Sequence, residues 1–158
     1  MYRQNPKNNY QAWVIRLGIG LATLSLGGLG TWPQPGRSHQ VEIADDVGGT
    51  LHIEPNDRPR VGQSHLTWFA LTQRGGQVIP LADCDCALAI YAGAYTPDRA
   101  PLSTARLTAS SAEPYQGIPA ATLVFPTVGQ YHLVLQGKPL GNGTFQPCPL
   151  IFPVTVTR

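Results

Sequence analysis

Turn-forming residues divide the sequence after residue 38 into short pieces. Proline and glycine recur at short intervals there, and the whole chain has 17 glycines and 15 prolines. Long windows with apolar residues at the 3.6-residue spacing of an amphipathic helix do not occur. Because glycine permits unusual backbone angles and proline presets one of them, both residues favour turns. We therefore expect short strands joined by many turns, which is an all-β fold.

Short apolar or alternating runs indicate where the strands lie. We expect seven of them, at residues 41–43, 51–53, 66–72, 84–91, 122–125, 131–136 and 150–156. Residues 66–71 are apolar on both faces, so they should form a central strand. Residues 93–117 are the least regular part, with one expected strand at 103–108. Seven short strands separated by turn signals predict a single immunoglobulin-like β-sandwich over residues 39–158.

The first 38 residues carry basic charge and an apolar run but no acidic residue. Their basic residues are Arg3, Lys7, Arg16 and Arg37, and residues 17–30 are uncharged. A basic start followed by a short apolar stretch is the signature of a secretory signal peptide, here with cleavage after Ser38. The alternative is a retained anchor, a hydrophobic N-terminal helix that associates with the membrane through residues 12–31. Both interpretations export residues 39–158 to the periplasm or an equivalent lumen.

Charge and motifs exclude two classes of function for the exported part. Residues 39–158 hold seven Lys and Arg residues against nine Asp and Glu residues, a balance of −2. Nucleic-acid-binding domains normally carry a basic patch, so we expect no nucleic acid partner. The sequence also lacks a Gly-x-Ser-x-Gly nucleophile turn, a phosphate loop and a dinucleotide fingerprint. We therefore predict a protein that is not an enzyme.

Several stretches occur in the same order as in a known group of exported domains. They are Glu54-Pro55 and Pro59-Arg60-Val61-Gly62 running into Trp68-Phe69-Ala70-Leu71, then Gly76-Gln77-Val78-Ile79-Pro80, and Gly129-Gln130-Tyr131-His132-Leu133. In these residues the sequence resembles the immunoglobulin-like domains grouped as YtkA-like, near the CopC copper proteins. The resemblance implies a β-sandwich and a link to copper through methionine-rich or N-terminal histidine ligands. Met1 is the only methionine here, so a methionine-based Cu(I) site is absent.

The three cysteines are Cys84, Cys86 and Cys148. Alternate residues on one face of a strand lie about 6.5–7 Å apart, too far for an easy disulfide between Cys84 and Cys86. Outside the cytoplasm we expect one of this pair to bond Cys148, which leaves one buried thiol. Two alternatives stay open: a Cys-x-Cys site for Cu(I) or Zn, because thiolates suit soft ions, and redox exchange.

His39, His52 and Glu54 are the candidate metal ligands. His39 matters only if cleavage falls after Ser38, because it then offers an α-amine and an imidazole that together suit Cu(II). His52 and Glu54 share one face of a strand, within reach of a terminal strand beside it. A Cu(II) site is one interpretation of these residues, and solvated surface groups are the other.

These observations together predict an exported binding or accessory module of unknown ligand and unknown protein partner. No cofactor is expected under this interpretation, and copper is the alternative. A periplasmic copper carrier that uses the histidines or cysteines is therefore one rival function. A single-helix accessory subunit of a membrane complex is another, because small residues permit close helix packing in lipid and the helix would offer such a face at Gly20, Leu24, Gly27 and Gly28.

Overall fold

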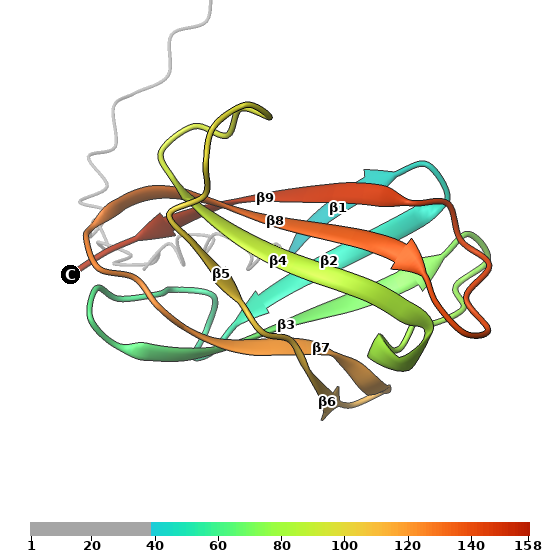
Figure 1. Ribbon diagram of the computed structural model, residues 1–158. Helices are drawn as coiled ribbons and strands as arrows, with labels where there is room; N and C mark the ends of the chain where they lie inside the picture. Colours follow the sequence, from blue (N-terminus) through green and yellow to red (C-terminus); the bar gives the residue numbers. More distant parts are fainter. Residues whose placement is uncertain (1–38) are drawn as a thin grey trace, which may run out of the picture. The chain divides into compact units, whose positions relative to one another are not determined.

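The computed structural model describes residues 39–158, which contain nine strands and one short 3-10 turn (Figure 1). The elements are β1 (Gln40–Ala44), β2 (Val47–Ile53), β3 (Ser64–Gln73), η1 (Leu81–Asp83), β4 (Cys84–Ala92), β5 (Ser103–Ala105), β6 (Thr108–Ala112), β7 (Tyr115–Val124), β8 (Gly129–Pro139) and β9 (Cys148–Val156). The expected signal peptide or N-terminal helix lies outside the described residues. Residues 39–158 contain no helix with the length and apolar character needed to cross a bilayer.

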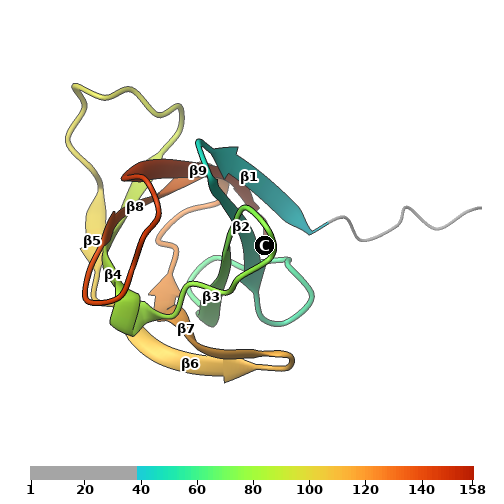
Figure 2. The same cartoon turned by 90° about the vertical axis from the view of Figure 1, so that its right-hand side faces the viewer.

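Antiparallel pairing joins the strands into two sheets, which Figure 2 shows as facing layers. The larger sheet has the order β1-β2-β3-β7-β6, and the smaller has the order β5-β4-β8-β9. In the immunoglobulin fold, strands A, B, E and D form one sheet and strands C, F and G form the other. Here β2, β3, β7 and β6 match the first set, and β4, β8 and β9 match the second, with β1 and β5 added at edges. The predicted immunoglobulin-like β-sandwich is confirmed.

A tyrosine at the start of β8 gives a second, independent mark of this fold. Tyr131 is only 1% exposed, yet its hydroxyl reaches the loop that precedes β8. The hydroxyl donates to the carbonyl oxygen of Thr127 at 3.0 Å and accepts from the Thr127 N–H at 3.2 Å. A tyrosine near the start of strand F that bonds back to the upstream backbone is the tyrosine corner of immunoglobulin-like sandwiches.

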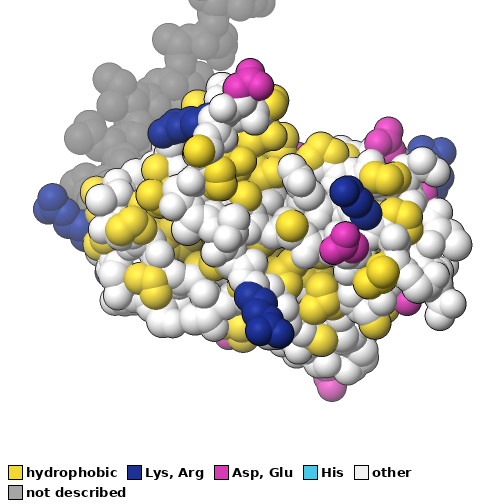
Figure 3. Space-filling model, viewed as in Figure 1, with side chains coloured by type: hydrophobic (Ala, Val, Ile, Leu, Met, Phe, Trp, Pro, Cys, Tyr) yellow, Lys and Arg dark blue, Asp and Glu magenta, His cyan; other side chains and the backbone are white. Residues whose placement is uncertain are grey.

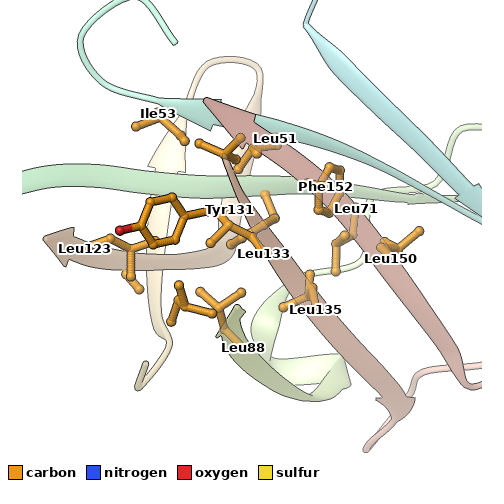
Figure 4. Close-up of a cluster of buried hydrophobic side chains, with 14 of the residues drawn as sticks. Leu51, Ile53, Leu71, Leu88, Leu123, Tyr131, Leu133, Leu135, Leu150 and Phe152 are labelled. Atoms are coloured by element: carbon orange, nitrogen blue, oxygen red, sulfur yellow. The ribbon is translucent and has the colours of Figure 1, made fainter. Parts of the chain in front are cut away.

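Alternate residues of each strand point between the two sheets and form the core. In β2, Val47, Leu51 and Ile53 are at most 4% exposed, whereas the residues between them are half-buried or lack a side chain. They belong to one buried cluster with Leu150 and Phe152 of the opposite sheet (Figure 4). Each such side chain contributes about 1.5–3 kcal/mol through burial of apolar surface. The period of two in the sequence thus decides which face of each strand is buried.

Gly49 allows the two sheets to approach closely at the centre of β2. A Cβ atom at this position would lie 2.6 Å from Leu150 Cδ1 and 3.2 Å from Phe152 Cζ. Carbon atoms do not approach to 2.6 Å without displacement of one of them. The missing side chain therefore lets β9 pack against the backbone of β2.

Each of the seven predicted strands lies wholly or largely within an observed strand. Residues 66–71 fall in β3, between β2 and β7, so the predicted central strand is confirmed. Residues 93–117 are more regular than expected, because they contain β5, β6 and the start of β7. β6 is an edge strand with mostly exposed residues, so its sequence shows no apolar alternation.

The outer surface of the four-stranded sheet faces the viewer in Figure 3. Lysine and arginine side chains on this face are few and scattered among polar, apolar and acidic side chains. This distribution agrees with the slightly acidic balance of residues 39–158.

Candidate metal centre

Three aromatic rings lie in a row on the outer face of the five-stranded sheet. Trp68 in β3 pairs with His52 in β2, and their rings stack with centroids 3.9 Å apart at an angle of 14°. His39 directly precedes β1, whose first residue Gln40 pairs with Leu51. His39 therefore falls beside His52, and the two imidazole centroids are 4.1 Å apart. The pairing of β1, β2 and β3 thus gathers three residues that are distant in the sequence.

Asp57 completes this group from the loop that follows β2. Asn56 and Asp57 have φ angles of 67° and 55°, in the left-handed region that asparagine and aspartate tolerate better than most residues. The turn is closed by two hydrogen bonds. The Asp57 N–H donates to the Ile53 carbonyl oxygen at 2.7 Å, and the Ile53 N–H donates to Asp57 Oδ1 at 2.8 Å. The carboxylate is therefore held in place by the end of β2.

The ligand atoms of His39, His52 and Asp57 all lie within 4.8 Å of one another. His39 Nδ1 is 3.5 Å from Asp57 Oδ2, and His52 Nδ1 is 3.8 Å from Asp57 Oδ1. The three side chains differ in accessibility, with 53% of His39, 34% of Asp57 and 18% of His52 exposed. The largely buried His52, the loop carboxylate of Asp57 and the accessible imidazole of His39 thus converge at the surface.

The electrostatics of the site keep His52 unprotonated. Burial lowers the pKa of His52 below its ordinary value of 6.5, and the neighbouring His39 lowers it further. Asp57 and Glu54 act in the opposite direction with smaller effects. At neutral pH the His52 imidazole is therefore neutral, the form in which histidine binds a metal ion.

The structure brings together two of the three predicted ligands, His39 and His52. β2 ends at Ile53, so Glu54 lies in the following turn and is exposed. Asp57 takes its place in the converging group. The sequence signal for this was the Asn56-Asp57 pair after a strand, which is turn chemistry that bends the chain back over the strand end.

A groove beside Asp57 makes this end of the sandwich accessible. Its volume is about 260 Å³, and it is lined by Gln40, Leu51, Ile53, Asp57, Pro153, Val154 and Thr155. The lining comes from β1, β2, β9 and the loop that follows β2, so the groove follows the side of the sandwich where β1 lies near β9 (Figure 2). Asp57 belongs to both the groove and the histidine group.

The other two histidines hold the backbone. His65 is 1% exposed, its Nε2 accepts from the Arg60 N–H at 2.9 Å, and its Nδ1 bonds the Glu54 carbonyl at 2.8 Å. His132 Nδ1 bonds the Gly93 carbonyl at 2.7 Å. Both rings satisfy backbone polar groups of the adjacent loops through hydrogen bonds, so their role is structural.

The cysteine pairing differs from the one expected. Cys84 and Cys86 form a disulfide, and Cys148 is a buried free thiol, so the expected bridge to Cys148 is wrong. Gly137 of β8 pairs with Cys86 on one side and with Cys148 on the other. Two strand spacings, about 9.5 Å, therefore separate Cys86 from Cys148, beyond the reach of a disulfide. The Cα atoms of Cys84 and Cys86 are only 5.2 Å apart, closer than in a fully extended strand.

The Cys148 thiol is poorly suited to act as a free nucleophile. It is 5% exposed, and burial raises its pKa, with further increases from Asp46 and Asp45. Asp46 is itself held by the Gln146 N–H at 2.8 Å, and this bond lowers the pKa of its carboxyl group. The neutral thiol is therefore favoured at Cys148.

No protein-family model and no curated protein matches this chain. Among solved structures, the crystal structure of the Lin-41 filamin domain is similar, with a TM-score of 0.41 and 18% sequence identity. The match covers 75% of this chain and 99% of that domain. The immunoglobulin-like assignment rests on the strand order and the Tyr131 corner described above, not on this similarity.

Proposed function

We propose that this chain is an exported, non-enzymatic binding module that takes a Cu(II) ion between His39, His52 and Asp57. The observation that carries the proposal is the convergence of two imidazoles and one carboxylate within 4.8 Å. Imidazole nitrogens and carboxylate oxygens are ligands that Cu(II) accepts, and Cu(II) binds such sites more tightly than the other divalent ions of its row.

Small movements would bring the three ligands to bonding distance. Ligand atoms at about 2 Å from one metal ion lie roughly 3 Å apart, against 3.5 and 3.8 Å for the two histidine–aspartate separations here. His39 is accessible enough to adjust, whereas His52 is supported by its stack on Trp68. A bound cation would also neutralise the negative charge of the Asp57 carboxylate.

Export and cleavage after Ser38 belong to the same proposal. They are supported by the acid-free basic start and the uncharged run at residues 17–30. Cleavage there gives His39 a free α-amine, which adds a fourth ligand suited to Cu(II). The resemblance to YtkA-like and CopC-like domains supports the same ion, with histidine ligands in place of the methionines that this chain lacks.

Competitive Cu(II) titration of the chain that begins at His39 tests the site. We expect Asp57→Asn to weaken Cu(II) binding at least about tenfold, because the variant loses the anionic ligand. An asparagine retains the oxygen that accepts from the Ile53 N–H, so the loop should keep its shape. Extension of the chain before His39 should weaken binding further by removing the α-amine.

Glu54→Gln is the matched control for Asp57→Asn. It removes the same charge from the same loop but does not touch the converging group. We expect Glu54→Gln to bind Cu(II) like the unmodified chain. Equal affinity in all three proteins would refute the site, and equal weakening in both variants would reduce it to a nonspecific charge effect.

A further inference from the structure

The three cysteines lie around Gly137, a residue without a side chain inside the four-stranded sheet. Gly137 in β8 lies between Cys86 in β4 and Cys148 in β9. A Cβ atom at Gly137 would lie 3.4 Å from Cys84 Sγ and 3.9 Å from Cys148 Sγ. Because Cys86 is bonded to Cys84, all three sulfurs belong to one group around this point. The proposed Cu(II) site uses none of them.

The surroundings of this cysteine group are largely buried. Cys84 is 3% exposed and Cys148 is 5% exposed, whereas Cys86 is half-buried. Phe145, also 3% exposed, covers the same point, with Cε2 3.5 Å from the Cβ position at Gly137. A largely buried, apolar environment with several sulfurs suits a soft ion better than ions that require oxygen ligands.

We propose that reduction of the Cys84–Cys86 disulfide opens a three-thiolate Cu(I) site made of Cys84, Cys86 and Cys148. A protein or small-molecule dithiol supplies two electrons and two protons, so the disulfide becomes two thiols while the dithiol closes its own disulfide. Cu(I) then binds the three sulfurs, and the thiol protons leave to water. In the oxidised chain two of the three ligands are consumed by the disulfide, so the site is closed.

Titration with Cu(I) against a competing chelator tests this proposal on the full chain, reduced by a phosphine that leaves no thiol. We expect one tightly bound Cu(I) in the reduced chain and none at the cysteines in the oxidised chain. Cys148→Ser should weaken binding by about 100-fold or more, because serine replaces one of three soft ligands by a hard one. His52→Ala should bind Cu(I) unchanged, which separates this site from the proposed Cu(II) site.

X-ray absorption at the copper edge gives a second measurement that needs no variant. Three sulfur neighbours around copper are expected in the reduced, loaded chain. Two sulfur neighbours, or full affinity in Cys148→Ser, would overturn the role of Cys148. Binding of Zn(II) without Cu(I), or equal Cu(I) binding by the oxidised chain, would overturn the site itself.

Discussion

The tyrosine corner offers a sharp test of the fold, because Tyr131→Phe removes one oxygen atom and leaves the buried ring. That oxygen bonds the Thr127 carbonyl at 3.0 Å, the Thr127 N–H at 3.2 Å and the Thr127 hydroxyl at 2.9 Å. A hydrogen bond of this kind contributes about 1 kcal/mol net. Because Thr127 is exposed, water can replace some of the hydrogen bonds that Thr127 loses in the variant. We expect a loss of about 1–2 kcal/mol in the free energy of unfolding.

Urea denaturation measures this loss. For a domain of this size, the slope of unfolding free energy against urea is about 1–3 kcal/mol per molar, so the midpoint should fall by roughly 1 M. Tyr91→Phe is the control, because Tyr91 is 8% exposed, packs edge-on against Tyr95, and makes no hydroxyl hydrogen bond within residues 39–158. It should change stability by less than about 0.5 kcal/mol. Equal effects of the two substitutions would refute the corner as a source of stability.

Three further predictions concern the core, the site and the thiols. Gly49→Ala should destabilise the fold by about 1–3 kcal/mol in the same urea assay, because the added Cβ meets Leu150 at 2.6 Å; an unchanged midpoint would contradict the close approach of the sheets. Stability should fall as pH is lowered through 6.5, because the lowered pKa of His52 makes the unfolded chain bind more protons there. His52→Gln should flatten that part of the pH profile, and an identical slope would contradict this origin. Thiol titration of the oxidised chain should find no reactive thiol when native and one, Cys148, after unfolding; three thiols in the unfolded chain would rule out the disulfide.

The location of the strands and their buried faces follows from local sequence. Alternation in β8 places Tyr131, Leu133 and Leu135 on one face, and all three are at most 1% exposed. The side-chain period of a strand is a local property, so it is visible in a run of a few residues. β5 and β6 were harder to predict, because their residues are exposed or half-buried and therefore show no clear apolar alternation.

Which residues of different strands become neighbours depends on the strand topology, and a local sequence pattern does not reveal that topology. The placement of β8 between β4 and β9 separates Cys86 from Cys148 and leaves Gly137 between them. The candidate metal site shows the same division. The proximity of His39 and His52 was predicted from a terminal strand beside another, whereas Asp57 replaced Glu54 because of how a left-handed turn folds back. Sequence periodicity thus determines which side chains are buried, and the order and register of the strands decide which of them meet.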